Sequence, residues 1–308
     1  MSVPVPSSAP ALPTAEARPL PAGGGVRRPS ARPRVARLKG RSLVPLLAAL
    51  VIAVTVLAAV AAPLVAVHDP TAGLLTNRLR PPFTGEFVLG TDALGRDIFS
   101  RLVYGARITV LVGIGSVLLA GLVGVVLGLV AGFFGGWVDR VVSACVDIQM
   151  SFPFLCLAIA LVAVLGTGLS NVIVVLAVSG WVLYARIVRA EALRLRSAEF
   201  VQAGRALGAT NLRLILGAIL PNVWASVIVV ATFTFAQMVI AEASLSYLGV
   251  GIQPPTPTWG GMLSDGQKYL QVAWWLVAFP GGALLALVLA VNLLGDWLRD
   301  VLDPRLRV

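Results

Sequence analysis

The chain has 308 residues, of which 58% are hydrophobic and only 12% are charged. Soluble domains carry about 25% charged residues, so this composition excludes an ordinary soluble domain and indicates a polytopic membrane protein. A formal net charge of +10 would also fit a nucleic-acid-binding protein. The arginines, however, lie beside apolar runs and lack the interleaved aromatic residues of a nucleic-acid surface, which argues against such binding.

Segment 1–41 is rich in Pro, Ala, Gly and Ser and contains almost no large apolar residues, so we expect a disordered, solvated basic tail. The basic residues between Arg27 and Arg41 directly precede the first apolar run, 43–67. By the positive-inside rule they place the N terminus in the cytoplasm. That run is long enough to span a bilayer and begins too late in the chain for a signal peptide. We therefore assign 42–107 to a first transmembrane helix followed by an external segment.

The external segment, 68–107, carries nearly balanced charges, unlike the basic tail. Within it, Asp97 and Arg101 are spaced i, i+4, which predicts an ion pair on one face of a helix. A surface pair of this kind contributes little to stability.

Five further apolar runs are each about as long as a bilayer requires. They cover 108–134, 141–165, 169–187, 223–248 and 272–294. With the first run they predict an all-α protein with six transmembrane helices and both termini in the cytoplasm. Basic residues gather in the connections assigned to the cytoplasm and in the C-terminal tail, 299–308, which supports this orientation. Cys145 and Cys156 would lie on one helix about 16 Å apart, too far for a disulfide.

The segment between the fourth and fifth runs, 191–222, predicts a helix, a glycine turn and a second helix. Ser197 is expected to cap a helix that runs through Leu207, and Gly208 suits its left-handed end. Thr210 can cap the second helix, whose apolar stripe ends at Pro221. The stripe consists of Leu212, Ile215, Leu216, Ile219 and Leu220.

Small residues at helical spacing favour close packing between spans. They include Gly113, Gly121, Gly124, Gly128 and Gly132. Ionisable groups in a span are costly and are therefore candidates for a functional site. Asp147 and Glu242 meet this criterion, with Gln237 as a further polar residue, so all three are candidates for a translocation pathway. A structural role between helices is the competing interpretation.

The sequence contains no GxxxxGK[ST] phosphate-binding motif, no GxSxG and no HExxH. One histidine and two cysteines are not enough for a usual transition-metal site, so we expect no metal and no catalytic residue in this chain. A pathway-forming membrane subunit is therefore favoured over an enzyme.

Residues 202–221 resemble the EAA motif of importer-type ABC permeases. Gln202, Ala203 and Gly204 stand where that family has Glu-Ala-Ala, whereas Gly208, Leu220 and Pro221 match in type and spacing. The missing glutamate removes any role of an acidic side chain at position 202, and the helix-glycine-helix pattern is retained.

The resemblance extends over nearly the whole chain after residue 43. Over this length the chain is similar to the second permease subunit of dipeptide and oligopeptide importers. Its motifs are LGTDALGRDIFSRLVYGAR at 89–107, DIQMSFPFL at 147–155, EFVQAGRALGA at 199–209, EASLSYLGVGIQPPTPTWGGML at 242–263 and GDWLRDVLDPRLR at 295–307.

The resemblance implies the type I ABC importer permease fold, with a transmembrane domain over 108–298 and a cytoplasmic coupling loop at 191–221, in a bacterial plasma membrane. It implies pairing with a homologous permease, two cytoplasmic ATPase subunits that bind ATP and Mg²⁺, and an extracytoplasmic substrate-binding protein. This chain would bind no cofactor itself and would contact peptide substrate and membrane lipid. The implied ATPase-coupling residues are Glu199, Phe200, Gln202, Ala203, Gly204, Arg205, Leu207, Gly208, Ala209, Leu220 and Pro221.

Three alternatives remain open at this point. The motifs concern architecture, so the same family could import nickel chelates, glutathione or another small solute. An ion-coupled secondary transporter would show mid-span charges and matched halves, and we find no internal repeat of that kind. A membrane scaffold would not account for the double-helix loop.

Overall fold

The computed structural model describes residues 43–302. Most of these residues are in helices, and the only β structure among them consists of isolated bridges between residues 84 and 97. The expected disordered tail, 1–41, and the last six residues lie outside the described part. Five helices in it are long and apolar enough to cross a membrane, and a bent pair makes a sixth candidate. The all-α fold expected from composition is confirmed.

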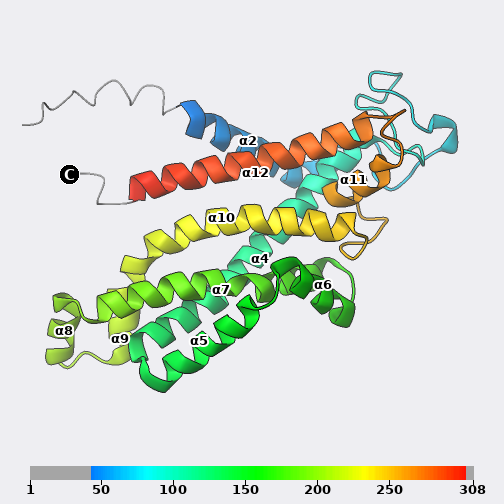
Figure 1. Ribbon diagram of the computed structural model, residues 1–308. Helices are drawn as coiled ribbons and strands as arrows, with labels where there is room; N and C mark the ends of the chain where they lie inside the picture. The colour runs from blue at the N-terminus through cyan, green and yellow to red at the C-terminus, as the bar shows by residue number, and fades with distance from the viewer. Residues whose placement is uncertain (1–42, 303–308) are drawn as a thin grey trace, which may run out of the picture. The chain divides into compact units, whose positions relative to one another are not determined.

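The first span consists of α2 (Leu43–Val60) and the short α3 (Ala62–Val65). A connection that contains the 3₁₀ turn η2 (Leu75–Asn77) leads to α4 (Ile98–Phe134). The second span therefore begins ten residues before the expected 108–134 run, because α4 continues through the polar residues at its start (Figure 1).

The third apolar run is not one straight helix. It forms α5 (Gly136–Met150) and α6 (Phe154–Leu165), which meet at an angle of 92°. Pro153 lies between them, lacks an amide hydrogen and cannot continue the helix, which explains the break. Cys145 and Cys156 thus lie on different helices, contrary to expectation, and both are free thiols.

The rest of the chain forms three further long helical spans and the connections between them. The fourth span, α7 (Leu169–Arg196), runs to Arg196, so the first six residues of the expected 191–222 loop belong to a membrane helix. The remaining elements are α8 (Glu199–Ala206), α9 (Asn211–Leu214), the π-turn η3 (Ile215–Ile219), α10 (Leu220–Tyr247), α11 (Trp259–Gln267) and α12 (Trp275–Leu302).

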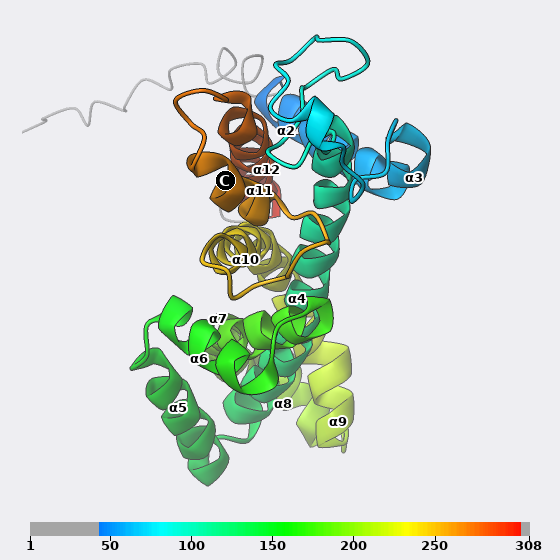
Figure 2. The same cartoon turned by 90° about the vertical axis from the view of Figure 1, so that its right-hand side faces the viewer.

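Glycines on α4 allow the backbones of α4 and α7 to approach closely. A Cβ atom added at Gly124, Gly128 or Gly132 would lie 2.4, 2.7 or 2.6 Å from a carbonyl oxygen of α7. Gly113 approaches the ring of Phe235 on α10 in the same way. Close packing through small residues is therefore confirmed. On the other side of α10, helix α12 packs against both α10 and α2 (Figures 1 and 2).

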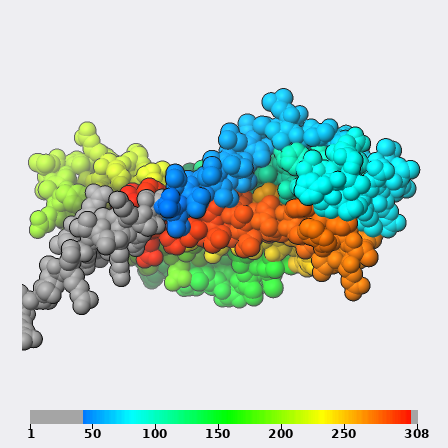
Figure 3. Space-filling view, turned by 90° about the horizontal axis from the view of Figure 1, so that it is seen from above, coloured from blue at the N-terminus to red at the C-terminus, as the bar shows by residue number. Residues whose placement is uncertain are grey.

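The segment 66–97 folds against α11 and the start of α12 (Figure 3). The indole of Trp275 donates to the carbonyl of Thr91, and the Arg78 guanidinium carbon lies 5.8 Å from the ring centroid of Tyr269. The turns that connect α4 to α5 and α7 to α9 lie at the opposite end of the long helices (Figure 1). The two polar ends are thus separated by the length of the spans.

Candidate coupling site

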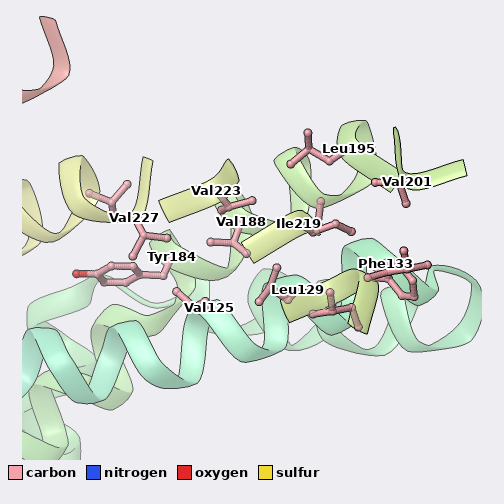
Figure 4. Close-up of a cluster of buried hydrophobic side chains, with 14 of the residues drawn as sticks. Val125, Leu129, Phe133, Tyr184, Val188, Leu195, Val201, Ile219, Val223 and Val227 are labelled. Carbon is pink, nitrogen blue, oxygen red and sulfur yellow. The ribbon is translucent and has the colours of Figure 1, made fainter. Parts of the chain in front are cut away.

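Helix α8 is a short helix that connects two membrane helices and buries only one side. Val201 is fully buried in a cluster that contains Phe133 of α4, Leu195 of α7 and Ile219 of η3 (Figure 4). Phe200 is 50% exposed and Leu207 is 89% exposed. Large apolar side chains that face solvent in a polar connection are typical of a binding surface. The helix is thus anchored by Val201 and presents Phe200 and Leu207 outward.

The beginning of α8 differs from the expectation at Ser197. Its hydroxyl donates to the carbonyl of Arg194 at 2.9 Å, and Ala198 precedes the helix in an extended conformation without a side-chain cap. Ser197 therefore does not cap α8, because α7 extends far enough for the serine to bond to its last turn. The side-chain amide of Gln202 donates to the carbonyl of Arg196 at 3.2 Å and closes the turn between the helices.

The end of α8 confirms the expectation at Gly208, which has a φ of +80°. The amide of Gly208 donates to the carbonyl of Arg205, and the amide of Ala209 donates to that of Gly204, each at 3.0 Å. These two bonds form a Schellman motif, which requires a left-handed residue and therefore favours glycine. Gly208 thus sets the direction in which the chain leaves α8.

Gly204 is small for a different reason. A Cβ atom at this position would lie 2.9 Å from a methyl carbon of Leu214, so the close approach of α8 to α9 favours glycine. Glu199, Gln202, Ala203 and Arg205 are exposed on α8 and remain available to a partner.

Thr210 caps α9 as expected, since its hydroxyl accepts from the amide of Arg213 at 3.4 Å. Pro221, however, does not end the second helix. The π-turn at 215–219 widens the helix immediately before the proline, and the helical path continues from Asn211 to Tyr247. The wider turn leaves room for the ring of Pro221. Proline has no amide hydrogen to donate, and the π-turn needs none at this position, so the helix continues.

The predicted stripe on this helix is only partly buried. Ile215 and Ile219 are in the core, Leu220 is half-buried, and Leu212 and Leu216 are exposed. Because Leu220 and Pro221 begin α10, the structure places these two predicted coupling residues on the membrane helix that follows the turn, apart from α8.

The three pathway candidates lie in different environments. Glu242 on α10 is fully buried, and one carboxyl oxygen accepts from the hydroxyl of Ser246 at 2.8 Å. Asp147 on α5 and Gln237 on α10 are exposed on the chain. Of the three candidates, therefore, only Asp147 and Gln237 are accessible in a single chain. Glu242 is bonded to the next turn of its own helix, which is a structural role.

The sequence interpretation missed a buried charged network at the other end of the spans. The carboxylate of Asp92 accepts from Arg96 Nε at 2.6 Å and lies 3.6 Å from Arg101 Nε. Arg96 also lies 3.7 Å from Asp265 of α11. The expected Asp97–Arg101 pair is wrong, because Asp97 caps α4 by accepting from the amide of Ser100 at 2.9 Å.

Comparisons with known proteins bear on this arrangement. A di/tripeptide transport system permease protein of Pseudomonas aeruginosa is 43% identical over 257 residues, which cover 82% of this chain and 85% of the relative. A glutathione transport system permease protein of Pectobacterium atrosepticum is 42% identical over 219 residues, covering 71% of this chain and 73% of the relative.

A chain of the MetNI methionine ABC transporter, solved in an inward-facing conformation, has the same fold. It superposes with a TM-score of 0.54 at 23% identity and covers 66% of this chain and 96% of its own length. Residues 124–308 match the family described as binding-protein-dependent transport system inner membrane component. This protein therefore belongs to the family of inner membrane components of binding-protein-dependent transport systems.

Proposed function

We propose that this chain is a permease subunit that imports dipeptides and oligopeptides, with energy supplied by separate ATPase subunits. The names of its relatives in Pseudomonas aeruginosa and Alkalihalophilus pseudofirmus, which are di/tripeptide and dipeptide transport permeases, support peptides as the solute. The observation that carries the coupling role is the exposure of Phe200 on α8 and of Leu207, the residue that follows the helix, in the connection between two membrane helices.

In this proposal α8 binds a groove on an ATPase subunit. Phe200, Ala203 and Leu207 provide the apolar contact, and Glu199 and Arg205 lie at its rim. Movement of the ATPase then acts on the membrane helices through two connections. One is the short 197–198 turn to α7, and the other is the Schellman turn at Gly208 that leads into α9 and α10.

The assembly we propose contains a second, similar permease, two ATPase subunits that bind ATP and Mg²⁺, and an extracytoplasmic substrate-binding protein. The polar end built from 66–97 and α11 is the surface for the binding protein. Both termini of this chain and α8 lie in the cytoplasm of a bacterial cell, in accordance with the distribution of basic residues. Asp147 and Gln237 face the shared pathway, and this accounts for polar groups exposed on membrane helices.

The turn at Gly208 provides the test. Gly208→Val should abolish uptake of a radiolabelled dipeptide and transport-coupled ATP hydrolysis, because a β-branched residue at φ of +80° is strained by about 1–3 kcal/mol. Membrane insertion should be retained, since a Cβ atom at Gly208 would meet no neighbouring atom within 4 Å.

Gly217→Val is the matched control. Gly217 also has no atom within 4 Å of an added Cβ, but it has no positive φ. The control should transport as the wild type does. Wild-type uptake by the Gly208→Val variant would contradict the coupling role of this turn.

Glutathione is a second candidate solute within the same family, because the Pectobacterium atrosepticum relative is named for its transport. Competition of labelled dipeptide uptake by unlabelled glutathione separates the two. A peptide importer should be inhibited by unlabelled dipeptides and remain insensitive to glutathione at the same concentration.

A further inference from the structure

A cavity of about 520 Å³ lies beside α8, between the ends of α4 and α7 and the start of α9. The cavity is open to its surroundings and most of the side chains that line it are polar. Two arginines, Arg196 and Arg205, line it together with the polar side chains of Ser197, Gln202 and Asn211, and no acidic residue lines it.

Phe133, at the end of α4, holds both arginines in place. Arg196 Nη1 donates to the carbonyl of Phe133 at 3.4 Å, and the Arg205 guanidinium carbon lies 5.7 Å from the centroid of the Phe133 ring. Gly135 makes room for Arg196, because a Cβ atom there would lie 2.7 Å from Nη1. Residues from α4, α7 and α8 thus bring two positive charges to one cavity.

Neither guanidinium is bound to a carboxylate in the part of the chain that the structure describes, and Asp139 acts on Arg196 only through space. Within residues 43–302, Arg196 and Arg205 form no ion pair with a carboxylate. Asp139, near the start of α5, is already bound to Arg189, whose Nη2 donates to it at 2.7 Å. Two arginine forks with unused donors bind phosphate oxygens well, because the fork matches the spacing of two oxygens.

The cavity lies where membrane helices end. Phe134, which closes α4, is 51% exposed, and Trp137 in the first turn of α5 is 69% exposed. An exposed tryptophan at the end of a span is typical of the lipid headgroup level, because its ring is amphipathic. We propose that the cavity binds the phosphate group of an anionic phospholipid, with Arg196 and Arg205 as its ligands. The proposal depends on where α4 and α5 end and is independent of the transported solute, but it shares Arg205 with the ATPase contact of the proposed function.

The bound phosphate would connect the end of α7 to the last turn of α8. Arg196 lies at the last residue of α7 and Arg205 in the last turn of α8, so a phosphate bound to both would restrain α8 relative to the membrane helices. A zwitterionic choline lipid carries a cation next to its phosphate, and the two arginines would repel that cation. The site is therefore selective for phosphatidylglycerol over phosphatidylcholine.

Native mass spectrometry of the full-length chain in detergent micelles tests the proposal. The micelles contain either dioleoylphosphatidylglycerol or dioleoylphosphatidylcholine, and the fraction of protein with a bound lipid is measured. The wild type should bind phosphatidylglycerol at least about tenfold more tightly than phosphatidylcholine. Arg205→Gln and Arg196→Gln should each weaken phosphatidylglycerol binding about tenfold, since each removes a charge-assisted contact.

Arg194→Gln is the matched control, because Arg194 is exposed at the same end of α7 and does not line the cavity. It should bind lipid as the wild type does. Arg205 is itself exposed, so its substitution should not disturb folding, and it keeps the test decisive if Arg196→Gln is unstable.

Three results would overturn the proposal. The first is equal binding of both lipids by the wild type, and the second is wild-type lipid binding by Arg205→Gln. The third is displacement of the lipid by inorganic phosphate at the same concentration, which would show a site for a free anion.

Discussion

Asp92 is the residue on which the polar end of the molecule depends most directly. It is 7% exposed, and one carboxyl oxygen accepts from the amides of Leu94 and Arg96 at 2.8 and 2.9 Å. Its other oxygen faces the side chains of Arg96 and Arg101, which are also buried. A buried charge that loses its partner is costly, so the two arginines make Asp92 a structural requirement.

Asp92→Asn should therefore destabilise the protein by about 3–5 kcal/mol, because the amide removes the nearest carboxylate of both buried arginines. Arg96 would keep only its longer contact with Asp265, at 3.7 Å. Thermal unfolding of the purified chain in detergent measures the effect as a lower midpoint. Glu86→Gln is the control, since Glu86 is 70% exposed and its contact with His68 lies at the surface. A midpoint for Asp92→Asn equal to that of the control would contradict the role of Asp92.

Among the helices, α4 and α7 approach each other closely because glycines of α4 lie at their contact. Gly124, Gly128 and Gly132 recur every four residues, so they lie on one face of α4, and each lies against the backbone of α7. Gly121 is different, because a Cβ atom there would lie 3.5 Å from the ring of Tyr184, which is ordinary contact.

Gly128→Ala should destabilise the α4–α7 pair by about 1–3 kcal/mol, since its Cβ atom would lie 2.7 Å from the carbonyl oxygen of Ala185 and force the helices apart. Gly121→Ala changes the same helix by the same group and should be nearly neutral. Unfolding midpoints in detergent compare the two. Equal destabilisation by both would show that loss of glycine, and not the close approach, is responsible.

The bend between α5 and α6 shows why an apolar run alone does not predict an element. The side-chain amide of Gln149 donates to the carbonyls of Val178 and Ser179 at 2.9 and 3.0 Å, and its oxygen accepts from Trp181 Nε1 at 2.7 Å. These bonds attach the end of α5 to α7 immediately before Pro153. The hydropathy of this run shows only that it is apolar. The direction that the chain takes after Pro153 depends on the packing of α5 against α7.

Along the spans that the structure describes, apolar side chains are exposed, and the Asp–Arg ion pairs lie toward the two ends. Leu118, Leu122 and Leu285, for example, are each more than 60% exposed. Exposed apolar side chains of this kind are stable in a lipid bilayer, because the hydrocarbon core contains no water. The chain therefore has two polar ends on opposite sides of a membrane, and their orientation can be measured.

Cysteine labelling in whole cells tests the proposed orientation. After Cys145→Ser and Cys156→Ala remove the two free thiols, Ser197→Cys and Gln253→Cys place one thiol at each end. A membrane-impermeant maleimide should label the variant with Gln253→Cys in intact cells, and the variant with Ser197→Cys only after the cells are opened. The reverse pattern would place α8 outside the cell and exclude its contact with a cytoplasmic ATPase.

Features that depend on composition and on a few neighbouring residues can be predicted from the amino-acid sequence. The all-α membrane class follows from the length and apolarity of the runs, and the turn at Gly208 and the cap at Thr210 follow from local backbone chemistry. The family resemblance predicts coupling residues within 199–209 and at Leu220 and Pro221, and the structure places 199–206 on a partly exposed helix between two spans.

Features that depend on distant partners are set by packing in the folded protein. Ser197 bonds back to α7 because that helix extends to Arg196, and Arg101 turns to Asp92 because Asp97 is occupied as a helix cap. Local spacing predicts which bonds are possible, whereas packing selects among them by the cost of leaving buried polar groups unpaired. For the same reason, the convergence of Arg196 and Arg205 on Phe133, 63 and 72 positions apart from it along the chain, becomes visible only in the folded protein.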